Sequence, residues 1–522
     1  MKINPVIVVS VTETAGEEAM DRRIQPSAAA IARVRRIPDA TSHPFPSLSF
    51  ALFDRSGILF HEGRGEFQLD GRAPTRDTIY RICSLSKSFC AAVILVLREQ
   101  GRLSLDDPVS LYVPEFPDYI DSHGVMVPIT VRMLMTNSSG LPEDNAWADY
   151  SLGIAREALT SLLHAGLGYA DVPDVGFQYS NLGFAILGRL VENITGQRFE
   201  HVATEQLLKP LGLSSTHYDV AEYPEQGEGG AGIAHGFVTF DEGETWQEKP
   251  FVETGAFACL GSMYSTPTDI ARWSAWLSAP FDEGYGDDAI LSRASRRLMQ
   301  RIATTVQESE RSAQPELDNV GYGLGLFVDE DHRFGGFAYH AGGLPGFTSH
   351  MRWHCASGLG VVMFANTNSV SLTRWSAQIL RTVLDDRALA ARRIALWPET
   401  FAAAEEIDVS IRGDGDFGTK SLFAPNVLID VPADVRARRL RAVIAEVGGL
   451  VLDPPPLARR LRWTESSAQL CWSVLGESGD LDCRIEITPV FPRRVQRLEI
   501  TVAKTEERAI VGRSYTPVVV DH

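Results

Sequence analysis

The pattern of apolar and polar positions predicts strands near both ends of a long first region and helices in its middle. Residues 47–63 are typical of two strands that meet at a turn, Asp54-Arg55-Ser56-Gly57. Residues 84–310 favour helices separated by Gly- and Pro-containing loops, and residues 320–366 again predict strands. Residues 371–386 predict a closing helix. Strands at both ends of the region with helices between them favour an α+β fold.

The pattern changes at about residue 395. A helix is predicted over 434–449, and Asp453-Pro454-Pro455-Pro456 predicts a break. Mostly alternating apolar positions predict strands at 407–411, 427–431, 470–474, 484–488 and 497–502. We therefore expect a peripheral segment at 1–30, a large α+β domain at 31–392 and a β-rich accessory domain at 393–522. The accessory domain could shape specificity or serve only stability or dimerisation.

The first candidate for chemistry is Ser84-Leu85-Ser86-Lys87, an S-x-x-K motif at the start of a helical pattern that ends at Gly101. A spacing of three places Ser84 and Lys87 on one helix face, where the lysine can reach the hydroxyl. A serine needs such a partner to become a nucleophile. The chain has only six lysines among 49 basic residues, and only Lys87 has a serine three positions before it. The plain alternative is a lysine on the surface of a helix.

Two further motifs carry polar groups at the ends of predicted elements. Tyr179-Ser180-Asn181 opens a helical pattern, and a tyrosine beside a cation can act as a general base. His340-Ala341-Gly342-Gly343 lies in a predicted strand, where glycines permit the close approach of a ligand. The alternatives are a core tyrosine with an ordinary asparagine at a helix start, and a histidine satisfied within its strand.

The three motifs together, in this order, resemble the serine beta-lactamase and penicillin-binding-protein superfamily. Within it, the chain is most similar to the branch of class C beta-lactamases, D-Ala-D-Ala carboxypeptidases and D-aminopeptidases. The resemblance covers about residues 45–390 and includes family landmarks at 129–142, 261–277 and 321–328. It implies a beta-lactamase/transpeptidase-like fold, which is an antiparallel sheet flanked by helices together with a helical lobe. The nucleophile is then expected in the cleft between the sheet and the lobe.

The resemblance also implies a role for each motif residue. Ser84 is the expected nucleophile, and Lys87 and Tyr179 are the alternative bases for acylation. Asn181 is expected to bind the substrate's acyl amide, with Gly342 and Gly343 beside the substrate. His340 stands where many members have lysine, and is expected to orient the substrate or to stabilise Tyr179. The N–H groups of Ser84 and Gly343 are the expected oxyanion hole.

A histidine at position 340 argues against beta-lactams as the main substrates, because it lacks the permanent charge that suits their carboxylate. We therefore expect a serine hydrolase that forms an acyl-enzyme on small peptides or amides, with D- or other unusual residues. An esterase acting on short acyl esters is the first alternative. A non-catalytic module that binds a small ligand or short peptide is the second.

Composition and the absence of certain motifs argue against several other functions. A net charge of −18 is unfavourable for binding nucleic acid or an anionic membrane. The sequence contains no run of 18 apolar residues, so no membrane-spanning helix is predicted. We expect no metal or cofactor, because the chain lacks H-E-x-x-H and phosphate-loop motifs. The six cysteines are widely spread, which favours free thiols and a cytoplasmic location. Export, which is common in the family, and homo-oligomerisation stay open.

Near the N-terminus, Pro5–Val11 is too short for a good signal peptide and favours a short strand or a disordered tail. The Gly-rich segment Glu225–Gly232 predicts a surface loop, which could rim the active site or be a plain linker.

Overall fold

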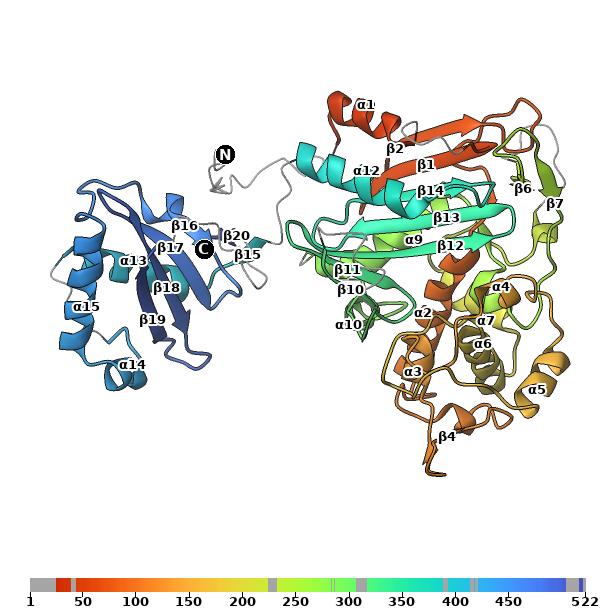
Figure 1. Cartoon of the computed structure of the whole chain (residues 1–522), viewed down its shortest axis with the longest axis horizontal. Coiled ribbons are helices and arrows are strands. Elements are labelled where there is room, and N and C mark those ends of the chain that lie inside the picture. Colours follow the sequence, from red (N-terminus) through yellow and green to blue (C-terminus); the bar gives the residue numbers. More distant parts are fainter. Residues whose placement is uncertain are drawn as a thin grey trace. The chain divides into compact units, whose positions relative to one another are not determined.

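The computed structural model describes residues 25–38, 44–223, 232–282, 284–285, 287–306, 317–387, 393–413, 417, 421–503 and 516–519. The apolar run Pro5–Val11 and nearly all of the predicted loop Glu225–Gly232 lie outside the described residues. The described residues form two compact units, one up to residue 387 and one from residue 393 (Figure 1). All six cysteines are buried and free.

The larger unit is built on an antiparallel sheet, as predicted. Eight of its described strands are ordered β2-β1-β14-β13-β12-β11-β10-β9. The first two flank the predicted turn, and the others come from the second half of the unit. Their bounds are β1 Ser47–Asp54, β2 Gly57–Gly65, β9 Thr304–Thr305, β10 Leu317–Tyr322, β11 Phe327–Asp331, β12 Gly335–Leu344, β13 Phe347–His354 and β14 Gly360–Ala365.

Helices cover both faces of this sheet (Figure 1). On one face, α1 (Ala28–Arg36) and α12 (Leu372–Asp386) pack on alternate side chains of β1, including Leu48 and Phe50. On the other face, α9 (Pro267–Ser278) packs against β1, β13 and β14, and β1 contributes Ala51 and Phe53 to the main core. The strand is therefore buried along its whole length. The helix α1 begins inside the segment expected to be peripheral, and its Val34 is fully buried.

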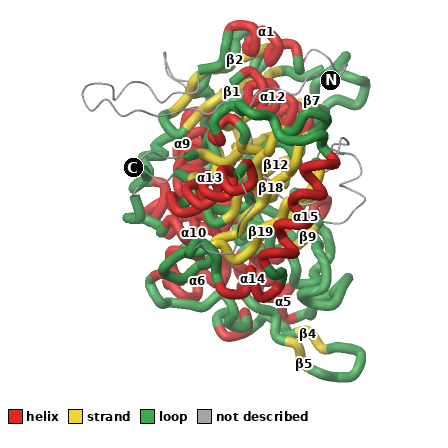
Figure 2. Tube along the Cα trace, turned by 90° about the vertical axis from the view of Figure 1, so that its left-hand side faces the viewer, coloured by secondary structure: helices red, strands yellow, loops and turns green. Residues whose placement is uncertain are grey.

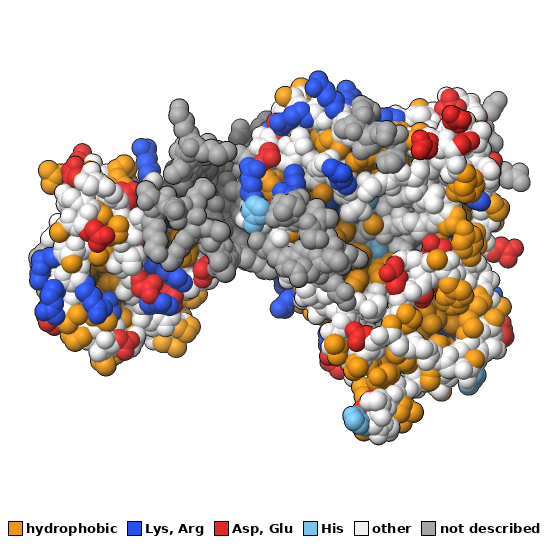
Figure 3. Space-filling model, in the orientation of Figure 1, with side chains coloured by type: hydrophobic (Ala, Val, Ile, Leu, Met, Phe, Trp, Pro, Cys, Tyr) orange, Lys and Arg blue, Asp and Glu red, His pale blue; other side chains and the backbone are white. Residues whose placement is uncertain are grey.

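A helical lobe lies at one end of the sheet (Figure 1). Hydrophobic side chains gather on the surface of this lobe (Figure 3). Its short hairpin, β4 (Tyr119–Ile120) and β5 (Met126–Val127), projects beyond the helices (Figure 2). Further short pairs are β3 (Tyr80–Arg81) with β8 (Tyr264–Ser265), and β6 (Gly236–Val238) with β7 (Gln247–Lys249). The remaining helices are α2 Ser86–Glu99, α3 Val131–Met135, α4 Asn145–Ala148, α5 Arg156–His164, α6 Asn181–Thr195, α7 Phe199–Ala203, α8 Ala258–Gly261 and α10 Arg293–Met299.

The smaller unit contains an antiparallel sheet, β16 (Leu461–Trp463), β17 (Gln469–Leu475), β18 (Asp480–Ile487) and β19 (Val495–Val502). A parallel pair, β15 (Arg393–Ala395) and β20 (Thr516–Val518), accompanies it. The helices are α13 Pro398–Arg412, α14 Pro425–Asp430 and α15 Ala433–Glu446. The predicted helix over 434–449 and the three later strands are confirmed.

The two earlier strands predicted in this unit are wrong. Residues 407–411 belong to α13, where Ile407 and Ile411 lie on the buried face while Val409 is 70% exposed. Residues 427–430 belong to α14, which begins with a proline, and Ile429 is 76% exposed. Apolar residues two apart fit a strand, but in α13 the buried Ile407 and Ile411 lie four residues apart, which places them on one face of a helix.

No helix in the described ranges is both long enough and apolar enough to cross a membrane.

Candidate active site

Ser84 lies in a 3₁₀ turn, Cys83–Leu85, that leads directly into α2. Cys83, just before it, has a left-handed backbone with φ of +51°, which is uncommon for a residue with a side chain. The turn is held by the Leu85 N–H, which donates to the Ile82 carbonyl at 3.2 Å. The Ser86 hydroxyl adds a bond to the Cys83 carbonyl at 2.7 Å. Ser84 is partly exposed, whereas residues 81–83 before it and 85–90 after it are buried.

Lys87, the second residue of α2, is fully buried, and its side-chain nitrogen has three partners. Nζ lies 3.0 Å from Ser84 Oγ, 2.6 Å from Asn181 Oδ1 and 3.2 Å from the carbonyl oxygen of Leu260. Two of these partners, an amide oxygen and a backbone carbonyl, can only accept hydrogen bonds. The structure thus places the predicted serine and lysine in direct contact.

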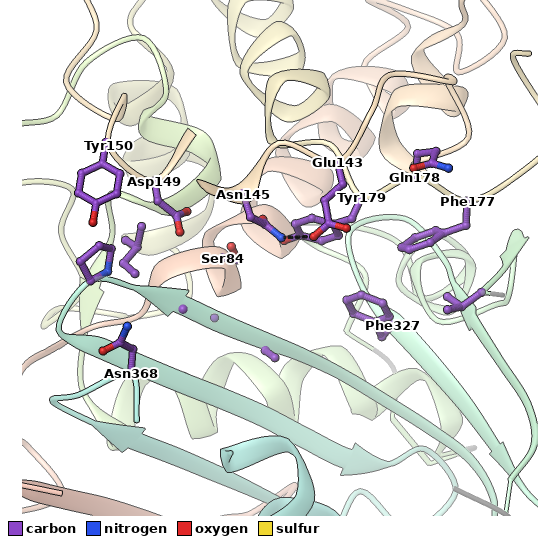
Figure 4. Close-up of a pocket in the computed structure, with 16 residues that line it drawn as sticks. Ser84, Glu143, Asn145, Asp149, Tyr150, Phe177, Gln178, Tyr179, Phe327 and Asn368 are labelled. Carbon is purple, nitrogen blue, oxygen red and sulfur yellow. Dashed lines mark hydrogen bonds between the residues drawn. The ribbon is translucent and has the colours of Figure 1, made fainter. Parts of the chain in front are cut away.

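A chain of amides extends from Lys87 to the rim of the site. Asn181 Nδ2 donates to Asn145 Oδ1 at 2.8 Å. Asn145 Nδ2 donates in turn to Glu143 Oε1 at 2.7 Å, as Figure 4 shows. Because the Glu143 carboxylate can only accept, it fixes the orientation of Asn145, which in turn fixes that of Asn181. The amide oxygen of Asn181 must therefore face Lys87.

Asn181 is 1% exposed and does not line the cavity, and its expected contact with the substrate's acyl amide stays a prediction. Its backbone N–H and that of Leu182 donate to the two carboxylate oxygens of Asp144, at 2.7 and 2.8 Å. Asp144 therefore satisfies free N–H groups at the start of α6. Of the two linked asparagines, Asn145 is the one that lies on the cavity wall.

Tyr179 lies two residues before the start of α6, with its ring beside Lys87. The centroid of the ring is 5.0 Å from Lys87 Nζ, within the range of a cation–π contact. Asn137 holds the backbone on both sides of Tyr179, because its carbonyl accepts from Gln178 and its side-chain oxygen accepts from Ser180. Tyr179 lines the cavity together with Ser84.

His340 is fully buried and does not line the cavity. One ring nitrogen, Nδ1, lies 2.6 Å from the Ala341 carbonyl, and Nε2 lies 3.2 Å from the Tyr322 hydroxyl. An Nδ1–H donor and an Nε2 acceptor satisfy both contacts. Burial, aided by the nearby charge of Lys87, lowers the pKa of His340 to about 3. The ring is therefore neutral near pH 7, and its centroid lies 6.2 Å from that of the Tyr179 ring. Its two expected roles stay predictions.

The strand β12 brings Gly342 and Gly343 to the wall of the cavity. β11 pairs with β12 only as far as Tyr339, so among the described residues the rest of β12 has no strand partner on that side and forms a free edge. The N–H of Cys355, directly after β13, donates to the Gly336 carbonyl, so Gly336 faces the β13 side. Antiparallel alternation then directs the N–H of Gly343 to the free edge. A Cβ at Gly342 would lie 2.7 Å from the Ile82 carbonyl, so a glycine is needed for this strand to approach the turn that carries Ser84.

The cavity between these elements has a volume of about 740 Å³. Its wall includes residues that the sequence reasoning missed: Glu143, Asn145, Asp149, Tyr150, Phe177 and Phe327 (Figure 4). Four of them lie in the segment that directly follows the landmark 129–142. A dense run of acidic and amide residues, Glu-Asp-Asn-Ala-Trp-Ala-Asp, was the signal available in the sequence.

Comparison with known proteins identifies the family. A family model described as Beta-lactamase matches residues 20–383, which is most of the chain. The chain belongs to the beta-lactamase family. The predicted family and its fold, an antiparallel sheet with a helical lobe, are thereby confirmed.

Two curated relatives share this beta-lactamase region. Protein flp of Staphylococcus aureus is 26% identical over 332 residues, covering 62% of this chain and 60% of its own length. Penicillin-binding protein 4* of Bacillus subtilis is 25% identical over 312 residues, covering 56% of this chain and 62% of its own length. The chain therefore spans about three fifths of the length of these relatives.

Solved structures of the beta-lactamase fold are similar at lower identity. An octameric penicillin-binding protein homologue from Pyrococcus abyssi has a TM-score of 0.55 and 19% identity, covering 90% of this chain and 97% of its own. A D-stereospecific amidohydrolase from Streptomyces sp. has a TM-score of 0.51 and 22% identity, covering 68% and 98%. EstCE1, a hydrolase with promiscuous acyltransferase activity, has a TM-score of 0.55 and 20% identity, also covering 68% and 98%. At these identities they show the fold alone.

Proposed function

We propose that this protein is a serine hydrolase that cleaves small peptides or amides through an acyl-enzyme on Ser84, with D- or other unusual residues as its substrates. The observation that carries the proposal is the 3.0 Å contact between Ser84 Oγ and the buried Lys87 Nζ, inside a cavity of substrate size. Membership of a family that typically consists of serine hydrolases supports it.

The partners of Lys87 support its role as the proton acceptor. An amine has two N–H groups and one lone pair, and the two acceptor-only partners, Asn181 Oδ1 and the Leu260 carbonyl, take the two N–H groups. In the amine form, the lone pair then faces Ser84 Oγ. The serine proton moves to Lys87 Nζ while Ser84 Oγ bonds to the substrate carbonyl carbon.

The remaining steps need a proton donor and a site for negative charge. The N–H groups of Ser84 and Gly343 are the proposed hydrogen-bond donors to the oxyanion. Tyr179, beside Lys87, delivers a proton to the leaving nitrogen as the C–N bond breaks. Water then attacks the acyl carbon and gives its proton to the Tyr179 oxygen, and Lys87 returns the proton that it took to Ser84 Oγ as the ester bond breaks.

The free edge of β12 favours peptides and amides over simple esters. An extended peptide can pair with the exposed N–H and C=O groups beyond Tyr339, as an added strand does. A short acyl ester lacks the N–H groups for such pairing. The fold is shared with both a D-stereospecific amidohydrolase and EstCE1, so it does not choose between these chemistries.

Turnover of a matched substrate panel tests the proposal. The panel contains D-Ala and L-Ala p-nitroanilides, p-nitrophenyl butyrate and nitrocefin, each assayed with wild type, Ser84→Ala and Lys87→Arg. We expect D-amide cleavage to dominate, and Ser84→Ala to reduce it by at least about 10³-fold. Lys87→Arg keeps a charge but cannot readily supply a neutral amine, so we expect a loss of about 10²-fold or more.

Intact-mass analysis with a fluorophosphonate probe provides the second readout. Wild type should gain one adduct and Ser84→Ala none. Lys209→Arg is the matched control, since Lys209 is an exposed lysine that pairs with Glu205 on the surface. Dominant turnover of the ester would indicate an esterase. A probe that leaves Ser84 unlabelled would favour the non-catalytic binding module.

A further inference from the structure

Asp149 is a partly buried carboxylate on the wall of the cavity, directly after α4. In Figure 4 its side chain points into the same space as Ser84. Within the described part of the chain, its carboxylate has no hydrogen-bond or ion-pair partner, in contrast to its acidic neighbours. Asp144 accepts from two N–H groups of α6, and Glu143 accepts from Asn145. A partly desolvated carboxylate without a partner is costly unless a ligand supplies one.

The charges around Asp149 leave the wall of the cavity anionic. The charged side chains on that wall are Glu143 and Asp149, and the described wall contains no lysine, arginine or histidine. The two cations that act on Asp149, Lys87 and Arg81, are buried behind the wall. Burial raises the pKa of Asp149 to about 6, and the negative charge of Asp144 adds to the rise while the two cations oppose it.

Tyr150 adds an aromatic ring to the same wall. It is 76% exposed, and its side chain lies next to Asp149 in Figure 4. A carboxylate and an aromatic ring side by side are the two kinds of group that bind an ammonium ion. A neutral acyl group would gain nothing from the carboxylate.

We propose that Asp149 binds a protonated amine of the substrate, so that the preferred substrates are aminoacyl amides or short peptides with a free amino terminus. The inference rests on the proposed function, because it names the substrate class of that same site. Asp149 is then a specificity-determining residue, and the ammonium group lies between its carboxylate and the ring of Tyr150.

A pair of substrates that differ in one ammonium group tests this directly. Alanyl p-nitroanilide, as both enantiomers, is compared with propionyl p-nitroanilide, which has the same acyl skeleton without the amine. At about pH 7 the ammonium form is well populated. We expect the kcat/KM of wild type to be about 10- to 100-fold higher for the better alanyl enantiomer than for the propionyl substrate. This is the range for one hydrogen bond to a charged group.

Asp149→Asn keeps the shape of the side chain and removes its charge. We expect the alanyl-to-propionyl ratio to fall to within about threefold of one, mainly through a higher KM for the alanyl substrate. Asp149→Glu keeps the charge and should retain most of the preference, which protects the test if the asparagine variant is unstable. Glu157→Gln is the matched control, since it removes an exposed charge from α5, away from the cavity wall.

Several outcomes would overturn the inference. Equal turnover of both substrates by wild type would do so, as would an equal loss for both substrates in Asp149→Asn, which would indicate a role in the chemistry itself. A loss of preference in Glu157→Gln would show that only the overall charge matters. Fluorophosphonate labelling keeps the two proposals separate: a labelled Ser84 without amine preference refutes this inference alone, whereas an unlabelled Ser84 refutes the proposed function.

Discussion

Replacing Gly342 by alanine tests how closely β12 must approach the nucleophile. The added Cβ would lie 2.3 Å from Ser349 Oγ, 2.7 Å from the Ile82 carbonyl oxygen and 2.9 Å from Cys83 Cβ. Ordinary contacts begin at 3.4 Å. The serine hydroxyl could rotate away, but it donates to that same Ile82 carbonyl at 2.6 Å and would lose the bond. The other two atoms belong to the rigid segment that carries Ser84.

The strand and the turn must therefore separate by roughly half an ångström to 1 Å, a displacement that can reduce activity by about 10²-fold. Overpacking of this kind also costs about 1–3 kcal/mol of stability. We expect Gly342→Ala to lower kcat/KM for the best amide substrate by that factor, with a lower Tm in a thermal melt.

Gly343→Ala is the informative comparison, because a Cβ there would meet no atom within 4 Å. It keeps the backbone N–H, so we expect a smaller loss of activity and an unchanged Tm. Wild-type activity in Gly342→Ala, or equal losses in the two variants, would refute the packing described for this strand.

Four further outcomes follow from the structure. Asp144→Ala removes the acceptor for two N–H groups at the start of α6, so chemical denaturation should show a loss of about 1–2 kcal/mol; an unchanged midpoint would contradict this. Arg352→Met leaves the buried charge of Asp329 unpaired, and we expect a loss of about 3–5 kcal/mol by the same method, whereas a loss below about 1 kcal/mol would argue against the ion pair. His340→Gln should leave the shape of the pH–rate profile between about pH 5 and 8 unchanged, because the pKa of His340 is held near 3; disappearance of a limb in this range would show that His340 titrates there. Asp149 is charged above its pKa of about 6 and neutral below it, so the preference for the aminoacyl substrate should fade as the pH drops through that value, and a constant ratio down to about pH 4 would count against its role.

The sequence predicted much of the larger unit because its elements carry strong local signals. The turn at Asp54–Gly57, the helix after Ser84 and the alternating strands of 320–366 all appear in the structure. The contact of Ser84 with Lys87 also followed from helical spacing alone. In the smaller unit, the strand predicted at 407–411 was wrong. The exposed Val409 lies between the buried Ile407 and Ile411 and completed an apparent alternation.

The polar wall of the cavity could not be predicted, because its members are brought together by tertiary contacts. Nothing in local spacing indicates that Asn145 meets Asn181, or that Asp144 caps a helix which begins 37 residues later. The burial of His340 likewise depends on Tyr322 from another strand. Sequence motifs located the chemical groups, whereas the directions in which they point required the fold.

The chain of amides from Glu143 to Lys87 limits which mutations this protein can tolerate. Each link must donate at one end and accept at the other, and the two asparagines do both with one short side chain. Aspartate at position 145 or 181 would place two acceptors face to face, and leucine would leave two polar groups unpaired. A single change at one link therefore disrupts its neighbours, so that Glu143, Asn145 and Asn181 are constrained to vary together or to remain as they are.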